Sequence, residues 1–564
     1  MNELIIVKPE KCVGCNACIR NCPAPDANKV IALDNGKRIV TVEPSRCIAC
    51  GECIRACTHD ARDYVDDTEE AMATIAKEKV IIMVSPAIKA VMPTRWKGVL
   101  DWFRSQGCIL FDISFGADIC TWAHLHALEQ NPGNKLITQP CSAIVNYIEM
   151  YQPKLLTNLS RIHSPVCCGV TYIKNYLRRT NKIAVLSPCI AKKMELEETG
   201  LAEFNMTFKK VMEYFDKNGI RIPVNPVDNY EYKFDEEQGL MGGIYTRPAG
   251  LRDNLWLHNP DINAVNSEGA QRIYTILENY AKMPENKHPE VFDVMSCEFG
   301  CNAGPGTGSE QTMFDVTYVM QDVEREAKKR RKTTGGMFRS ANEDKLFKRF
   351  DEELNLADFI RTYKPGVQPP IPPESELNEI FEKMGKHTEA DRKIDCKACG
   401  YQTCREMAIA VSRGLNFADG CIMNKGAAPA AAGASAENDE KFAEVRSECL
   451  SLTERLRSSM DAISENMDTI GTTADATGER ANVVTDLLKN VVAFCNGRST
   501  MDADSVQQLV GILETTIDAF SVLNDNVTET NESAALVRES VQDITKLIDS
   551  MNETLQSTDD AQEN

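Results

Sequence analysis

Short apolar runs alternate with amphipathic stretches between Val80 and about residue 365. Apolar runs of this length predict buried strands, and the amphipathic stretches between them predict helices. Strands that alternate with helices are typical of α/β units with parallel strands. Just before the first run, residues 66–78 have the pattern of a connecting helix. The clearest runs are 80–84, 108–112, 135–138, 182–186 and 291–294.

A different pattern occupies residues 439–564, where apolar side chains recur at spacings of three and four. This period predicts helices, and Asn496-Gly497 interrupts it near the middle. We expect two helices of about 55 residues each, folded as a hairpin or a coiled coil. The narrow apolar stripe must be covered by the returning helix, by a second subunit or by a partner. The region is therefore either a dimerisation stalk of a homodimer or an output segment for a signalling partner.

Changes in composition divide the chain into five parts. Residues 365–373 are rich in proline and are expected to form a stiff spacer. Residues 427–436 are rich in alanine and have no periodic pattern, which is typical of a flexible joint. The expected parts are a cysteine-dense segment at 1–65, the α/β segment at 66–365, a linker with a second cysteine module at 366–425, a flexible linker at 426–438 and the helical region at 439–564.

The 564-residue chain contains 22 cysteines, far above ordinary usage. C-x2-C spacings in a chain of this length favour metal binding in a reducing compartment over a disulfide framework. The first apolar run is too short for a signal peptide, and no stretch approaches the roughly 20 apolar residues of a membrane span. We therefore expect a cytoplasmic protein without a membrane partner. The formal net charge of −20 argues against nucleic acid as a partner.

Two copies of a C-x2-C-x2-C-x3-C motif lie within the first 65 residues. Three closely spaced thiolates bind three corners of one 4Fe-4S cubane, and the fourth cysteine of each run binds the other cluster. The motif therefore predicts a ferredoxin-like domain, and its doubled spacing argues against two zinc knuckles. One cluster is expected on Cys12, Cys15, Cys18 and Cys57, and the other on Cys22, Cys47, Cys50 and Cys53.

A third cysteine module has the spacing C-x2-C-x4-C-x16-C. It resembles a small 4Fe-4S domain found in several anaerobic redox enzymes. Residues 408–416 have the pattern of a helix that would bring the last cysteine back to the cluster. A structural zinc site is the alternative. The expected ligands are Cys396, Cys399, Cys404 and Cys421.

Four more cysteines lie in three short segments that are far apart in the chain. The segments read TQPC, SPCIAK and MSCEFGC, and they carry Cys141, Cys189, Cys297 and Cys301. Each segment follows a predicted strand, and loops at the carboxyl ends of strands form the ligand sites of open α/β sheets. Four thiolates can hold a cubane. Together with the N-terminal motifs, this pattern resembles the three signature segments of FeFe-hydrogenases.

The resemblance implies an H-cluster, which is a 4Fe-4S cubane joined to a di-iron centre that carries CO, cyanide and a dithiolate. In that family four cysteines hold the cubane, and the position matched by Cys301 also bridges to the di-iron centre. The positions of Pro86 and Ala87 belong to a loop that touches a cyanide ligand. Lys192 would donate to a cyanide, and Met295 would pack against the di-iron face. The implied chemistry is the reversible conversion of protons and electrons into H2.

The expected architecture is thus multidomain, α+β and α/β. It consists of a ferredoxin-like domain with two 4Fe-4S clusters, a two-lobed α/β hydrogenase domain, a small 4Fe-4S domain and a long C-terminal helical hairpin or coiled coil.

The departures from the family pattern concern proton transfer. Members with high turnover carry a cysteine immediately before the first ligand, and here that position is Pro140. Proline has neither a thiol nor an N–H, so it cannot relay a proton. Two glutamates on the preceding helix of those members match His124 and Ala127 here. His124 could titrate on another route or lie at the surface, and Glu298 could restore a titratable group near the cofactor.

Loss of the relay should lower turnover and leave cofactor binding intact, because general acid–base steps commonly contribute about 10²–10⁴ in rate. Slow chemistry joined to a helical tail favours a sensory FeFe-hydrogenase that binds H2 and slowly splits or forms it. The second hypothesis is a catalytic hydrogenase with a non-standard proton path and a ferredoxin-like electron partner. The third is a non-enzymatic iron–sulfur scaffold, as in relatives that share the lobes and lack the di-iron centre.

Overall fold

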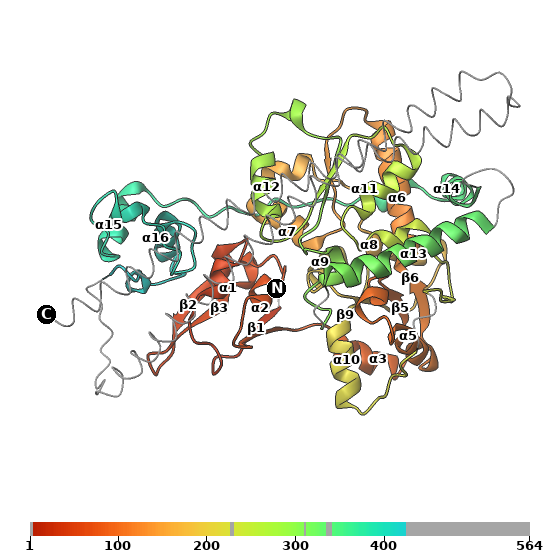
Figure 1. The fold of residues 1–564 in the computed structure, drawn as a ribbon, viewed down its shortest axis with the longest axis horizontal. Coiled ribbons are helices and arrows are strands. Elements are labelled where there is room, and N and C mark those ends of the chain that lie inside the picture. Colours follow the sequence, from red (N-terminus) through yellow and green to blue (C-terminus); the bar gives the residue numbers. More distant parts are fainter. Residues whose placement is uncertain (1–3, 226–229, 309–311, 334–340, 425–564) are drawn as a thin grey trace, which may run out of the picture. The chain divides into compact units, whose positions relative to one another are not determined.

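The computed structural model describes residues 4–225, 230–308, 312–333 and 341–424 (Figure 1). The chain divides into two compact units, Met1–Ala427 and Ala428–Asn564. All described residues belong to the first unit. The flexible linker and the helical region expected at 426–438 and 439–564 therefore lie outside the described residues. Among the described helices, none is both long enough and apolar enough to cross a membrane.

The N-terminal domain is built from two antiparallel pairs of strands. β1 pairs with β4, and β2 pairs with β3. A short helix follows the second cysteine of each motif, and each begins after a residue in the left-handed conformation, Asn16 or Gly51. The elements are β1 (Ile5–Val7), α1 (Ala17–Arg20), η1 (Pro25–Ala27), β2 (Asn28–Ala32), β3 (Arg38–Val42), η2 (Pro44–Arg46), α2 (Glu52–Arg55) and β4 (Arg62–Tyr64).

The first lobe of the central domain is a parallel sheet with the strand order β6-β5-β8-β9. Every residue of its strands is buried, as expected for a parallel sheet covered on both faces. Alternate residues enter different cores, so that Met83 joins one hydrophobic cluster and Ile82 the other. The strands are β5 (Ile81–Val84), β6 (Ile109–Asp112), β8 (Ile183–Ser187) and β9 (Phe204–Thr207).

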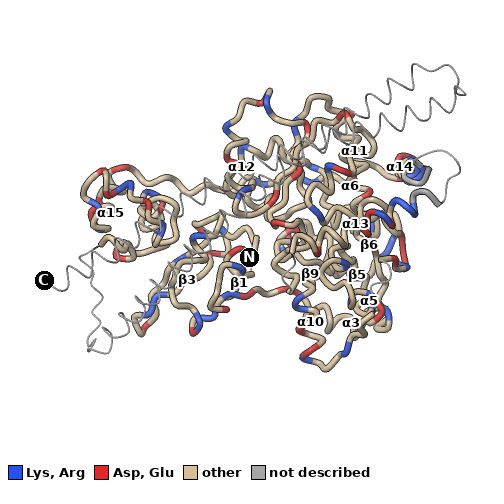
Figure 2. Tube along the Cα trace, viewed as in Figure 1, with Lys and Arg blue, Asp and Glu red and all other residues tan. Residues whose placement is uncertain are grey.

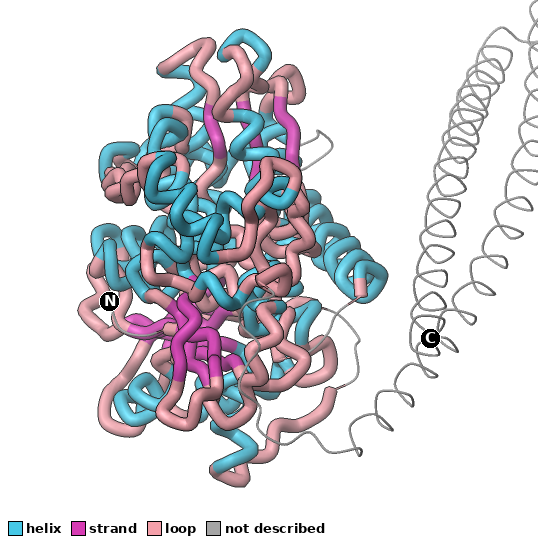
Figure 3. The backbone as a smooth tube through the Cα atoms, turned by 90° about the vertical axis from the view of Figure 1, so that its left-hand side faces the viewer, coloured by secondary structure: helices cyan, strands magenta, loops and turns pink. Residues whose placement is uncertain are grey.

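The second lobe is a smaller parallel sheet with the order β10-β11-β7. Its strands are β7 (Leu136–Ile137), β10 (Ala264–Ser267) and β11 (Val291–Val294). All five strands expected from the apolar runs are present, and they are parallel as expected. Figure 3 shows the strands in separate groups with helices around them. The sequence did not indicate β9 and β10, because each is only four residues long and contains an asparagine.

Helices surround both sheets of the central domain. The connecting helix expected at 66–78 is present as α3. The α-helices are α3 (Thr68–Ile75), α4 (Ile88–Val91), α5 (Trp96–Ser105), α6 (Ile113–Gln130), α7 (Ser142–Tyr151), α8 (Pro165–Thr171), α9 (Lys192–Thr199), α10 (Phe208–Lys217), α11 (Gly250–His258), α12 (Ile273–Tyr280), α13 (Met313–Thr333) and α14 (Ala341–Glu353). Shorter helical turns are η3 (Pro153–Thr157), η4 (Tyr172–Tyr176), η5 (Met241–Ile244), η6 (Glu285–Lys287), η7 (Gly300–Ala303) and η8 (Leu356–Phe359).

The third cysteine module contains α15 (Glu374–Lys383), η9 (Asp391–Lys393), α16 (Cys404–Ser412) and η10 (Ala418–Gly420). Helix α16 begins four residues earlier than the expected start at 408. The reason is the N-cap Thr403, whose hydroxyl accepts from the Glu406 N–H at 3.1 Å. The Glu406 carboxylate also accepts from the N–H of Gln402, the residue before the cap, at 2.9 Å.

This module packs against the N-terminal domain, although the central domain separates the two in the sequence. The Val30 N–H donates to the Leu415 carbonyl at 2.8 Å, and Arg38 pairs with Asp419 at 2.7 Å. Cysteines of both parts share one hydrophobic cluster. Basic and acidic residues are interspersed along the described chain, which gives this contact partners of both signs (Figure 2).

Candidate metal centres

A largely apolar cavity is lined by loops from both sheets of the central domain. About 810 Å³ of space in the cavity and at its mouth, part of it open to solvent, is not filled by protein atoms. The lining segments follow the carboxyl ends of β5, β7, β8 and β11, which is where ligands bind in open α/β sheets. These segments include Ser85-Pro86, Pro140-Cys141, Ser187 to Cys189 and Met295 to Cys297.

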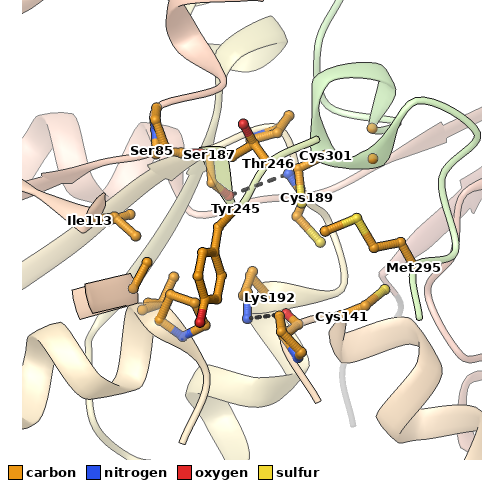
Figure 4. A pocket seen from close by; sticks show the side chains of 18 of the residues that line it. Ser85, Ile113, Cys141, Ser187, Cys189, Lys192, Tyr245, Thr246, Met295 and Cys301 are labelled. Atoms are coloured by element: carbon orange, nitrogen blue, oxygen red, sulfur yellow. Dashed lines mark hydrogen bonds between the residues drawn. The ribbon is translucent and has the colours of Figure 1, made fainter. Parts of the chain in front are cut away.

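The four signature cysteines all line this cavity: Cys141, Cys189, Cys297 and Cys301. Figure 4 shows Cys141, Cys189 and Met295 on the side of the cavity opposite Ile113. Burial raises the pKa of the Cys189 thiol to about 11 and that of Cys301 to about 12, and the neighbouring thiolates act in the same direction. Buried thiolates that repel one another require a cation before all of them ionise. The donor set therefore fits an iron–sulfur cubane.

Lys192 places an ammonium in the wall of the cavity, and its residue is only 7% exposed. It donates to the Pro140 carbonyl oxygen at 3.2 Å and makes a short hydrogen bond to the Glu195 carboxylate. Burial alone would lower the pKa of Lys192, but Glu195 and the adjacent thiolates raise it above its ordinary value. The side chain is therefore a permanently charged donor, suited to an anionic ligand in the cavity.

Glu195 connects this lysine to a buried arginine. The Glu195 carboxylate accepts from Arg361 Nη1 at 3.1 Å and from the Ser142 hydroxyl at 3.1 Å. Arg361 also pairs with Glu198 at 2.9 Å, and Glu198 is partly exposed. The sequence did not indicate a role for Glu195 or Arg361. The Lys192–Glu195 pair could have been expected, because Glu195 follows Lys192 by three residues on a helix.

The expected cofactor loop lies partly in the wall. Pro86 and Met295 line the cavity, whereas Ala87 is fully buried in the adjacent core and is not among the lining residues. The lining also includes Gly242. The Gly242 N–H donates to the Asp118 carboxylate at 2.6 Å, which holds the turn in place. A Cβ atom at Gly242 would meet the Ser114 carbonyl oxygen at 2.0 Å, so this approach requires glycine.

Two polar residues of the wall were not anticipated, Tyr245 and Thr246. The Tyr245 hydroxyl lies 2.8 Å from the Thr121 hydroxyl, and the Tyr245 side chain is buried. The signal that could have found them is their position directly after the glycine turn.

The expectation that His124 could be a surface residue is wrong. It is completely buried, because α6 packs on α8 and is apolar on most faces. Its Nδ1 lies 2.8 Å from the Cys120 carbonyl oxygen, which only accepts, so Nδ1 carries a proton. Its Nε2 lies 2.9 Å from the Ser160 hydroxyl. His124 is not among the residues that line the cavity, so any role in proton transfer would need intermediate groups.

Glu298 does not restore a titratable group to the cavity. Its side chain is 46% exposed and pairs with Arg272 at 3.2 Å. The loop between Cys297 and Cys301 turns through Gly300, which has a φ of +65°. This turn directs Cys301 to the cavity and leaves Glu298 outside the lining residues.

The N-terminal cysteines are brought together in the two expected sets. The first set lines a cavity of about 340 Å³: Cys12, Cys15, Cys18 and Cys57. In the second set, burial raises the pKa of Cys50 well above its ordinary value, and the charges of Cys22 and Cys53 add to the rise. The pKa of Cys22 is raised by burial first and then by the charges of Cys53 and Cys47. In the first set Cys12 and Cys18 are buried, Cys57 is partly exposed and Cys15 is exposed, and the four thiols surround one cavity. Each set thus supplies the four cysteines that a 4Fe-4S cluster needs.

The cysteines of the third module also converge on one cavity, of about 300 Å³: Cys396, Cys399, Cys404 and Cys421. No group of three or more His, Cys, Asp or Glu side chains in the described ranges is arranged to hold a single metal ion. In a cubane, by contrast, each cysteine binds a different iron atom.

The second N-terminal set adjoins the large cavity. Cys47, Cys50 and Cys53 share a hydrophobic cluster with Cys141 and Cys189. Tyr274 is buried between them, and its pKa is raised by burial first and then by the charges of Cys50 and Cys141. Arg55 donates to the Ala303 carbonyl at 2.8 Å across the same contact.

Three family models match consecutive parts of the chain. Residues 78–305 match the model described as "Iron only hydrogenase large subunit, C-terminal domain". The central domain is therefore similar, over residues 78–305, to the large subunit of iron-only hydrogenases. Residues 4–58 match the "4Fe-4S dicluster domain", and residues 393–423 match the "Putative Fe-S cluster" model. These matches confirm the expected order of a ferredoxin-like domain, a hydrogenase domain and a small iron–sulfur domain.

A curated relative is the cytosolic Fe-S cluster assembly factor NAR1 of Encephalitozoon cuniculi (strain GB-M1), which is 25% identical over 214 residues. The alignment covers 34% of this chain and 56% of the relative, so the chain spans about half the length of the relative that it matches.

Solved structures of FeFe-hydrogenases are also similar. One comes from a study of oxygen inactivation of the H cluster, and another is a variant of HydA1 from Chlamydomonas reinhardtii. Their TM-scores are both 0.40, with 16% and 15% identity, over 54% of this chain and 100% of theirs. Likeness at this level says nothing about activity.

Proposed function

We propose that this protein is a sensory FeFe-hydrogenase. It would bind H2 and split or form it slowly at an H-cluster in the large cavity, pass electrons through its 4Fe-4S clusters and signal through residues 439–564. The observation that carries the proposal is the position of Pro140, which lines the cavity directly beside Cys141. High-turnover members of the family place their proton-relay thiol at that point, and proline has no group that exchanges a proton.

The residues of the wall support cofactor binding better than fast proton transfer. When bound, the H-cluster supplies the redox chemistry of H2, and the protein supplies ligation, orientation and hydrogen bonds. Lys192 is held in place by Pro140 and Glu195, so that its ammonium can bind an anionic ligand. Apart from the cysteines, the titratable residues of the lining are Lys192 and Tyr245. Burial raises the pKa of Tyr245 well above its ordinary value, and that of Lys192 is also raised, so neither exchanges protons readily near neutrality.

Electron transfer is supported by the contiguity of the cysteine sites. The second N-terminal set shares a core with Cys141 and Cys189, and the third module shares a core with Cys18 and Cys53. A cluster in each site would thus form a series from the large cavity to the third module. A ferredoxin-like electron partner remains part of the proposal.

A non-enzymatic scaffold is the second candidate, and the likeness to an Fe-S cluster assembly factor favours it. The two candidates differ in whether a di-iron centre occupies the cavity. Infrared spectra of protein supplied with the di-iron cofactor should show bands of metal-bound CO and cyanide if it is a hydrogenase. Protein that contains its full complement of cubanes but lacks these bands would be a scaffold.

The rate then separates the sensory role from a catalytic hydrogenase with another proton route. We expect H2 oxidation, measured with an artificial electron acceptor, to be about 10²–10⁴ slower than in hydrogenases that carry the relay cysteine. Equal rates would contradict the sensory role and leave the catalytic one.

A further inference from the structure

Arg62 is a buried cation in the wall of the first N-terminal cysteine site. It begins β4, and only 4% of its surface is exposed. Its Nη2 donates to Cys18 Sγ at 3.2 Å and to the Val40 carbonyl at 3.0 Å. The same side chain lines the cavity that the first cysteine set forms. The guanidinium therefore contacts a ligand sulfur directly.

The charge of Arg62 also acts on the second cysteine set. Burial raises the pKa of Cys53 and of Cys47, and in both cases the positive charge of Arg62 opposes the rise. The thiolates of Cys53, Cys18 and Cys22 in turn stabilise the charged guanidinium, against the effect of burial. Cys18 of the first set and Cys53 of the second set belong to one hydrophobic cluster, so the guanidinium that bonds to Cys18 is also near the second set.

No carboxylate in the described part of the chain forms an ion pair with Arg62. A buried charge is normally paired, because removing it from water is expensive. Here the ligand thiolates are the anionic groups around it. Arginine remains protonated under all physiological conditions, so this positive charge does not depend on pH.

We propose that Arg62 raises the reduction potentials of both N-terminal 4Fe-4S clusters. Reduction adds one electron to a cluster and makes it more negative by one charge. A fixed cation nearby stabilises the reduced form more than the oxidised form, and an N–H donor to a ligand sulfur acts in the same direction. No proton is transferred, because arginine keeps its proton in both states.

The consequence is a domain that retains electrons. Clusters with raised potentials accept electrons from the neighbouring site in the hydrogenase domain and release them less readily. This inference depends only on the two-cluster domain, and it holds whether or not the cavity contains a di-iron centre.

The test is a redox titration of the full chain, followed by the EPR signals of the reduced clusters with dithionite as reductant. Arg62→Gln removes the charge and keeps a hydrogen-bond donor, and Arg62→Lys keeps the charge. Lys29→Gln is the matched control, since it removes an exposed cation from the same domain. In Arg62→Gln both N-terminal clusters should be at least tenfold harder to reduce at a given potential, which is a shift of about 59 mV for a one-electron couple.

Arg62→Lys should shift both potentials less than Arg62→Gln, and Lys29→Gln should leave them at the wild-type values. Iron content and EPR spin counts of each variant report whether the clusters are intact. Unchanged potentials in an intact Arg62→Gln protein would overturn the proposal, and so would a shift confined to one cluster. Loss of a cluster in both Arg62 variants would assign Arg62 a structural role and would also overturn it.

Discussion

The ammonium of Lys192 donates a hydrogen bond to the carbonyl oxygen of Pro140, 3.2 Å away. The lysine is therefore held by the backbone of residue 140 and not by its side chain. Substitution at this position should leave Lys192 in place. In the proposed hydrogenase, cofactor binding and proton transfer can thus be tested separately by mutation.

We expect Pro140→Cys to raise the rate of H2 oxidation by about 10²–10⁴, because it adds a thiol to the cavity wall beside Cys141. The measurement is H2-dependent reduction of an artificial acceptor by protein with equal infrared intensity from its cofactor. Pro140→Ala is the control, since it removes the ring without adding a thiol. Equal rates in the Cys and Ala variants would show that the missing relay does not limit turnover.

Glu195→Gln should destabilise the central domain by about 3–5 kcal/mol, because it leaves two buried cations, Lys192 and Arg361, without their shared carboxylate. The loss should be visible as a lower midpoint of thermal unfolding. Glu198→Gln is the matched control. Glu198 pairs with the same arginine but is 31% exposed, so its removal should cost no more than about 1 kcal/mol. A similar loss in both variants would contradict the importance of the buried pair.

The stability that the Lys192–Glu195 ion pair provides should be constant across neutral pH. Folding lowers the pKa of Glu195 below 4.5, because Lys192 and Arg361 outweigh the effect of burial. Its contribution is therefore present above pH 4.5 and is lost as the pH falls through the lowered pKa. Folding raises the pKa of Lys192 above 10.5, so its contribution is complete below pH 10.5 and is lost as the pH rises through the raised value.

The difference in unfolding midpoint between the wild type and Glu195→Gln, measured in a series of buffers, should accordingly be flat between these limits and shrink outside them. A difference that changes around pH 7 would mean that another group controls the pair.

Gly400→Ala should loosen the third module from the N-terminal domain. A Cβ atom at this residue would lie 2.7 Å from the Ile19 side chain, and the backbone has a φ of +96°. Gly414→Ala is the control, because Gly414 also has a positive φ, +67°, but open space around it. Limited proteolysis should cut Gly400→Ala within 366–425 faster than either the control or the wild type. Equal cleavage of the two variants would attribute the effect to backbone strain alone.

The positions of the strands and the grouping of the cysteines were predictable because their signals are local. A buried parallel strand has a continuous apolar run, as in 80–84, and the cysteines follow such runs directly. Cluster motifs have fixed spacings for the same reason, since short loops around a cubane allow few arrangements.

The orientation of individual side chains was not predictable, because it depends on contacts that are distant in sequence. His124 is buried by α8, and Glu298 is drawn to Arg272 across a turn. The apolar character of α6 around most of its circumference could have indicated the burial of His124. No sequence pattern indicated a role for Arg62, because that role depends on its hydrogen bond to Cys18 and on the proximity of Cys53, both of which are distant in sequence.

The described chain ends at Asn424, three residues after the last cysteine of the third module. That module is attached to the ferredoxin-like domain and not to the cavity. Residues 425–564 follow this module in the chain, so in the proposed electron path they would be joined to the cluster at the end of the series that starts at the cavity. If these residues act as the proposed output segment, they would respond to the reduction state of the nearest cluster. They would then respond to H2 only through the electrons that its oxidation supplies.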